Sequence, residues 1–108
     1  MAEVLSIEEL RARIDMIDDQ LVRLLNVRVA CAMEIGKLKH EAGLPIYQPD
    51  REAQVLGKVR DAAKALAGPL EAEAVARIFE RVIDEARRAE RHADSRRSGF
   101  AESGSDVG

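Results

Sequence analysis

Apolar residues recur at helical spacing along most of the chain. In the first third they fall in steps of three and four for about four heptads, which predicts one long helix from about Ser6 to Glu41. Ser6 followed by Glu9 has the pattern of a capping box, which favours a helix start at this point. The apolar stripe of this helix consists of Leu10, Ile14, Ile17, Leu21, Leu24, Leu25, Cys31, Ile35 and Leu38.

A helix of this length has a consequence for assembly. Thirty-odd residues make a rod roughly 50 Å long, whereas a compact domain of this size has a radius of gyration of about 13 Å. We therefore expect a second chain to cover the rod. Arg11 and Arg28 lie roughly 25 Å apart along it, so they can touch one small ligand only if they come from different chains.

Two shorter helices are expected after the first. Gly43 is typical of a helix stop, and residues 44–48 have the pattern of an extended loop. Pro49 favours the start of a second helix, and Gly68-Pro69 marks its end. A third helix is expected from about Glu71 to Arg91. The apolar face of the second helix carries Val55, Leu56, Val59, Ala63 and Leu66, and that of the third carries Val75, Ile78, Phe79, Val82, Ile83 and Ala86.

Composition supports an all-α fold. The chain has 108 residues, of which 46% are hydrophobic and only 3% aromatic, and this is typical of long helices and not of strands. We expect one helical domain at residues 1–91. Residues 92–108 are rich in serine and glycine, which predicts a disordered polar tail in which Phe100 is unanchored.

Charge and cysteine content exclude several functions. The formal net charge is -3, from 17 Lys+Arg and 20 Asp+Glu, which does not suggest a nucleic-acid binder. No apolar run reaches the ~18 residues of a membrane span, and no signal-peptide core is apparent. Cys31 is the single cysteine, so no disulfide framework forms within one chain. We therefore expect a cytoplasmic protein with neither a nucleic-acid nor a membrane partner.

Four charged residues stand where the helical pattern calls for apolar ones. Arg28 and Lys39 point the same way from the first helix, while Glu52 and Glu90 fall on the buried sides of the second and third. Each one alone could be a snorkelling side chain or an ion pair. Together they predict a shared polar pocket. Because buried cations without partners are costly, an excess of them suggests an anionic ligand.

The spacing of these residues resembles the all-helical class of chorismate mutases. The resemblance covers about residues 6 to 91, and Gly68-Pro69-Leu70 is similar to members that form the N-terminal part of bifunctional aromatic-biosynthesis enzymes. The residues that carry it are Leu10-Arg11-x-x-Ile14-Asp15-x-x-Asp18, Leu21, Leu24-Leu25, Arg28, Ile35-Gly36-x-x-Lys39, Pro45-Ile46-Tyr47, Arg51-Glu52 and Ile78-Phe79-x-x-Val82-Ile83.

The resemblance implies a fold, a reaction and a site. The fold would be an intertwined homodimer with two active sites, each completed by one arginine of the other subunit. The reaction would be the pericyclic rearrangement of chorismate to prephenate, which needs no metal and no cofactor. Arg11 of the partner and Arg28 would hold carboxylates, and Lys39 would bridge a carboxylate and the ether oxygen. Arg51 would add positive potential, and Glu52 would accept from the ring hydroxyl.

Two positions depart from the pattern of the family, and a third fits it only under a condition on its charge. Gln48 stands where some members carry aspartate near the ring hydroxyl, and Ala86 where a serine touches a carboxylate. Glu90 matches the second donor to the ether oxygen, which is glutamine or glutamate in the family. An ionised glutamate cannot donate, so the hypothesis is that the pocket raises the pKa of Glu90 and the protonated acid is competent. Lys39 and Glu90 are then the predicted catalytic pair.

Other interpretations remain open from the sequence. Arg11 could pair with Asp15 on the helix surface, and Lys39 could simply complement the helix C-terminus. Arg51 and Glu52 could be ordinary first-turn charges. Rival functions are an isochorismate pyruvate-lyase of the same fold and a non-catalytic helical dimerisation or regulatory module. A mutase activated by a partner enzyme of the same pathway is a further interpretation.

Overall fold

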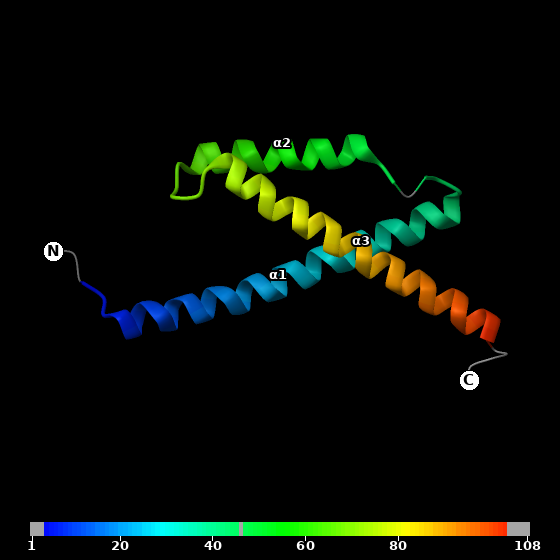
Figure 1. Ribbon diagram of the computed structural model, residues 1–108, viewed down its shortest axis with the longest axis horizontal. Helices are drawn as coiled ribbons and strands as arrows, with labels where there is room; N and C mark the ends of the chain where they lie inside the picture. The colour runs from blue at the N-terminus through cyan, green and yellow to red at the C-terminus, as the bar shows by residue number, and fades with distance from the viewer. Residues whose placement is uncertain (1–3, 46, 104–108) are drawn as a thin grey trace.

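The computed structural model describes the backbone of residues 4–45 and 47–103 and the side chains of residues 4–45 and 47–96. Three helices account for nearly all of this part of the chain: α1 (Ile7–Ala42), α2 (Pro49–Leu66) and α3 (Ala72–Ser103) (Figure 1). No strand occurs within these ranges. The predicted all-α fold of one long and two further helices is thus confirmed.

The two ends of α1 are closed by the residues that the sequence indicated. The Ser6 hydroxyl accepts from the backbone N–H of Glu9 at 3.1 Å, and the Glu9 carboxylate accepts from the N–H of Ser6 at 3.4 Å, which completes a capping box. At the other end Gly43 adopts a left-handed conformation with a φ of 70°. The N–H of Leu44 then bonds the carbonyl of Lys39 at 2.8 Å, as in a Schellman motif.

Both ends of α2 agree with the sequence. Pro49 occupies the first turn, as predicted, and the helix ends at Leu66, shortly before Gly68-Pro69, with Ala67 in the left-handed conformation at a φ of 51°. Its N–H bonds the carbonyl of Ala63 at 3.1 Å, which stops the helix before Gly68-Pro69 is reached. Alanine pays a steric cost there that glycine avoids.

Helix α3 is longer than the apolar stripe predicted. It continues past Arg91, its expected end, to Ser103. Residues 92–103, predicted to be disordered, are helical instead; they contain no proline that would stop the helix, although their serines and Gly99 are weak helix formers. The side chain of Phe100 and residues 104–108 lie outside the described part of the chain. The domain limit at residue 91 stays a prediction.

The helices form an open and elongated arrangement. Helix α3 packs against α2 with its first half and then crosses the second half of α1, while the first half of α1 extends away alone (Figure 1). The radius of gyration is 19.1 Å and the principal extents are 68 × 34 × 18 Å. A compact domain of this length would have a radius of about 13 Å. The predicted protruding rod is therefore present.

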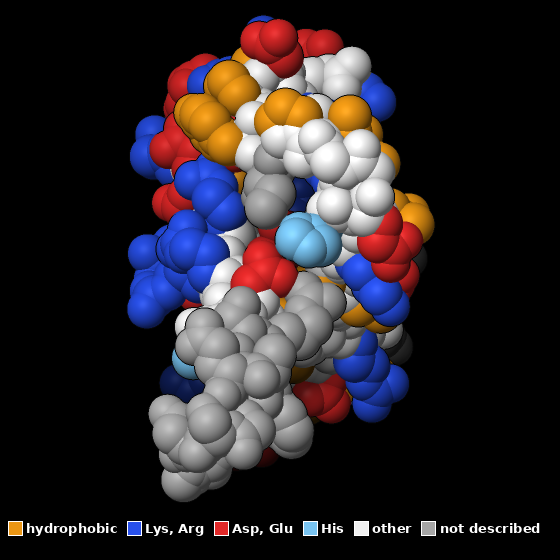
Figure 2. All heavy atoms as spheres, turned by 90° about the vertical axis from the view of Figure 1, so that its right-hand side faces the viewer, with side chains coloured by type: hydrophobic (Ala, Val, Ile, Leu, Met, Phe, Trp, Pro, Cys, Tyr) orange, Lys and Arg blue, Asp and Glu red, His pale blue; other side chains and the backbone are white. Residues whose placement is uncertain are grey.

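Within the described residues, this single chain has almost no core of its own. The buried hydrophobic residues are three alanines, Ala63, Ala76 and Ala86, and no large side chain is fully buried. Along α1 the apolar stripe is open to solvent, with Leu24 64% exposed and Ile14 54%. Apolar side chains also surface among charged ones when the molecule is viewed from one end (Figure 2). None of the described helices combines the length and the apolar character needed to cross a membrane.

Candidate active site

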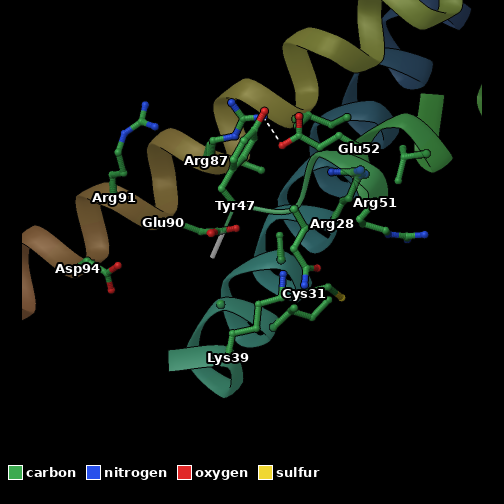
Figure 3. Close-up of a pocket in the computed structure, with 17 residues that line it drawn as sticks. Arg28, Cys31, Lys39, Tyr47, Arg51, Glu52, Arg87, Glu90, Arg91 and Asp94 are labelled. Carbon is green, nitrogen blue, oxygen red and sulfur yellow. Dashed lines mark hydrogen bonds and ion pairs between the residues drawn. The ribbon is translucent and has the colours of Figure 1, made fainter. Parts of the chain in front are cut away.

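A cavity of about 560 Å³ lies between the second half of α1, the start of α2 and the middle of α3 (Figure 3). Its size is that of a small-molecule site. The side chains around it come from all three helices and from the loop between α1 and α2. They are Arg28, Cys31, Ala32, Ile35, Gly36, Lys39, Tyr47, Gln48, Arg51, Glu52, Val55, Ile83, Ala86, Arg87, Glu90, Arg91 and Asp94.

The structure gathers most of the site residues that the sequence predicted. The four charged residues that break the apolar pattern, Arg28, Lys39, Glu52 and Glu90, all line this cavity, and Gln48 and Arg51 line it too. Arg11 does not line the cavity and is exposed on the first half of α1. One chain therefore brings together every predicted site residue except the one assigned to a partner subunit.

The cavity is positive although the chain is negative. Five basic side chains line it (Arg28, Lys39, Arg51, Arg87 and Arg91) against three acidic ones (Glu52, Glu90 and Asp94), a formal excess of two positive charges. Such focused potential attracts anions against the net charge of -3. Within the described ranges, no group of three or more His, Cys, Asp or Glu side chains could hold a metal ion.

Helix geometry explains how α1 supplies its wall. Arg28, Ala32, Ile35 and Lys39 follow one another at steps of three and four, so they share one face. The half-buried guanidinium of Arg28 lies 5.9 Å from the centroid of the Phe79 ring on α3, which limits its freedom by a cation–π contact. Arg28 is thereby pre-positioned at the inner end of the cavity.

Glu90 reaches the cavity from α3 at a point where α1 presents only backbone. A Cβ atom at Gly36 would lie 3.3 Å from its carboxylate oxygen Oε2, so glycine leaves room for the carboxylate. Burial raises the pKa of Glu90 above its usual value, the nearby charge of Asp94 raises it further, and Lys39 and Arg87 oppose both effects. The neutral acid therefore persists to higher pH than in an exposed glutamate.

The sequence interpretation missed a second charged group on α3. Arg87 pairs with Glu52 across the gap between α3 and α2, and with Asp84 on its own helix at 3.5 Å. Its guanidinium lies 5.7 Å from the centroid of the Tyr47 ring. Arg91 and Asp94 were missed too. The available signal was helical spacing: Arg87, Glu90, Arg91 and Asp94 continue the apolar stripe of α3 at steps of three and four.

Comparison with known proteins shows the family. The family described as Chorismate mutase type II matches residues 10–91. The chain belongs to this family. The resemblance drawn from the sequence is therefore confirmed, and the cavity lies within the matched residues except for Asp94.

Individual relatives agree with this assignment. The bifunctional chorismate mutase/prephenate dehydratase of Aquifex aeolicus is 38% identical over 78 residues, which are 71% of this chain and 22% of that protein. The enzyme of the same name from Neisseria gonorrhoeae is 43% identical over 81 residues, or 75% of this chain and 21% of that protein. The chain thus spans about a fifth of the length of these relatives.

A solved structure is similar over nearly its whole length. Chorismate mutase (form II) of Thermus thermophilus superimposes with a TM-score of 0.73 at 30% identity. The match covers 79% of this chain and 93% of that one. The three-helix arrangement is thus that of a solved chorismate mutase.

Proposed function

We propose that this protein is a chorismate mutase that rearranges chorismate to prephenate in the cytoplasm, as a step of phenylalanine and tyrosine biosynthesis. The observation that carries the proposal is the single cavity that holds Arg28, Lys39, Glu52 and Glu90 with an excess of positive charge. Chorismate carries two carboxylates, so a site with this excess suits a dianion of its size. Membership of the family supplies the reaction type.

Each side chain has a task that its chemistry supports. Arg28 holds a carboxylate by paired hydrogen bonds. Lys39 reaches a carboxylate and the ether oxygen, which gains negative charge as its C–O bond breaks. Glu52 accepts a hydrogen bond from the ring hydroxyl with Gln48 beside it, and Arg51 adds positive potential. The Nη1 of Arg51 donates to the Gln54 side chain at 2.6 Å, so its guanidinium lies along α2.

Electrostatics and confinement supply a sufficient rate gain. An acceleration of ~10⁶ requires about 8 kcal/mol. One preorganised donor at the ether oxygen contributes about 3–4 kcal/mol, and confinement of the substrate to its compact reactive conformer contributes much of the remainder. Glu90 adds a second donor when it is protonated, and its raised pKa favours that form. No proton needs to be transferred.

The proposed active form is a dimer of two copies of this chain. Its accessible surface is 8955 Å², compared with about 5,900 Å² for a compact protein of 11.9 kDa. The excess of about 3,000 Å² per chain, or about 6,000 Å² for two chains, is large enough to supply the total area that an obligate dimer buries. The open stripe of α1 offers the apolar part of that area, and a second α1 packed along it would carry Arg11 toward the other cavity.

The deciding experiment is chorismate depletion by the wild type, Arg28→Ala and Arg88→Ala, with folding checked by circular dichroism. Arg88 is an exposed arginine of α3 outside the cavity, which makes it a matched control. We expect Arg28→Ala to lose about 100-fold in kcat/KM, since it removes a charge-assisted pair, and Arg88→Ala to stay near the wild type.

Two results would overturn the proposal. Faster turnover of isochorismate than of chorismate by the wild type would make the protein an isochorismate pyruvate-lyase. A folded wild type that neither consumes chorismate nor binds a bicyclic transition-state mimic would make it a non-catalytic helical module.

A further inference from the structure

Arg87 is the best-fixed charged side chain of the cavity, although the sequence resemblance gives it no role. Three groups surround its guanidinium: the carboxylate of Glu52 on α2, the carboxylate of Asp84 on α3 and the ring of Tyr47 on the α1–α2 loop. Figure 3 shows the dashed contact with Glu52 and the tyrosine ring standing beside the arginine. Arg87 therefore links α3, α2 and the loop at one point of the cavity wall.

We propose that Arg87 is a positioning residue, which holds Glu52 and the Tyr47 loop in place and thereby fixes the acceptor for the ring hydroxyl of the substrate. The inference rests on the proposed function and concerns the same site. Recognition of the ring hydroxyl of the substrate then depends on Arg87, a side chain of α3 that need not touch the substrate.

Burial gives the contact between Arg87 and Glu52 its strength. The two side chains are 35% and 29% exposed, so they attract one another more strongly than a surface pair, and the planar guanidinium restricts the direction of the carboxylate. Glu52 lies in the first turn of α2 and lines the same cavity as Arg28, Lys39 and Arg51. Without Arg87, the carboxylate would lose the ion pair that sets its direction.

The tyrosine contact extends the same effect to the loop. Tyr47 and Gln48 are exposed, and the Gln48 side chain makes no capping bond to α2, although its backbone carbonyl accepts from the Glu52 N–H at 3.2 Å. A cation over the ring of Tyr47 holds that ring against α3. Because Gln48 is the next residue, Arg87 limits the position of both polar groups that the proposed function assigns to the hydroxyl side of the ligand.

The test compares chorismate with an analogue that lacks the ring hydroxyl. For Arg87→Met we expect kcat/KM for chorismate to fall about tenfold, because Glu52 loses its charged partner, while the value for the analogue changes less than about twofold. Arg87→Lys should stay within about threefold of the wild type for both, since it can still pair with Glu52. Arg88→Met, the exposed neighbour on α3, is the matched control and should behave as the wild type.

The assays test the role of Arg87 separately from the proposed function. Equal losses on both substrates would overturn it, since Arg87 would then bind a carboxylate directly or only support the fold. Unchanged activity of Arg87→Met would overturn it as well. Arg87→Gln replaces the methionine variant if the latter unfolds, and the ratio of the two substrates decides in the same way. A wild type inactive on chorismate would reject the proposed function instead.

Discussion

Under the proposed function, Glu90 poses the main chemical question at the scale of single residues, because a carboxylate would then stand beside an oxygen that becomes negative. Its surroundings change that assessment. Burial and the charge of Asp94 raise its pKa, while Lys39 and Arg87 lower it, so the balance between protonated and ionised forms depends on groups from both α1 and α3. A protonated Glu90 can donate to the ether oxygen, whereas the ionised form repels it.

This balance predicts an activity that depends on pH. As the pH rises through the raised pKa of Glu90, the donor is lost and kcat should fall. Glu90→Gln carries an amide donor at every pH and should abolish that fall, so that it equals or exceeds the wild type at alkaline pH. The measurement is kcat against pH for both proteins.

Glu80→Gln, on an exposed position of α3, is the matched control and should keep the wild-type profile. If Glu90→Gln also retains the wild-type curve, the ionisation that limits activity belongs to another group.

At the scale of elements, Gly36 of α1 leaves room for the Glu90 side chain of α3. The Glu90 carboxylate occupies space that a side chain at Gly36 would enter. Gly57, inside α2, has open space around it, with no atom within 4 Å of an added Cβ. Both glycines lie inside helices, where alanine is favoured by roughly 1 kcal/mol. Alanine variants at the two positions therefore separate the effect of helix propensity on stability from the need for space at the site.

We expect Gly36→Ala to lower kcat by about threefold to tenfold, because it moves the carboxylate by a few tenths of an ångström. Gly57→Ala should gain up to about 1 kcal/mol in the free energy of unfolding with kcat unchanged. Urea denaturation and chorismate turnover measure the two effects. Full activity of Gly36→Ala would show that Glu90 does not need its present place against α1.

The three helices also show which parts of the fold and of the candidate site could be predicted from the sequence. Periodicity and caps predicted α1 closely, because the Ser6–Glu9 box and Gly43 act through local hydrogen bonds. The predicted end of α3 at Arg91 was wrong by 12 residues, since residues 92–103 continue the helix without an apolar stripe that could have indicated it. Arg28, Lys39, Glu52 and Glu90 were predictable because each interrupts such a stripe.

Arg87 was not predictable in the same way. It is ordinary in a helix of alternating charges, and its importance appears only when α2 brings Glu52 beside it from 35 residues away. Arg91 and Asp94 continue the spacing of the α3 stripe past Ala86, but charged residues near the end of a helix are equally expected on an exposed face. Local periodicity therefore marks these positions only as candidates, and the tertiary contacts identify them as part of the cavity wall.

At the scale of the whole molecule, the exposed first half of α1 and the isolated Arg11 lead to one prediction. If each site takes Arg11 from a second chain, Arg11→Ala and Arg28→Ala are both inactive alone, but a mixed dimer has one intact site. Refolding the two variants together should restore about one quarter of the wild-type activity, since half of the dimers are mixed and each has one of two sites intact.

Each variant refolded alone is the control, and sedimentation equilibrium gives the mass of the assembly. An active monomer, or a mixture with no recovered activity despite exchange of chains, would contradict the shared site.

The positive excess of the cavity has a consequence for turnover. An isomerisation keeps both carboxylates of its reactant, so electrostatic attraction does not weaken when the bond has shifted. In the proposed reaction, the positive potential of the cavity would therefore retain prephenate by the same forces that capture chorismate. Departure of the product is then governed by shape and by ionic strength, and added salt should weaken capture and hasten release together.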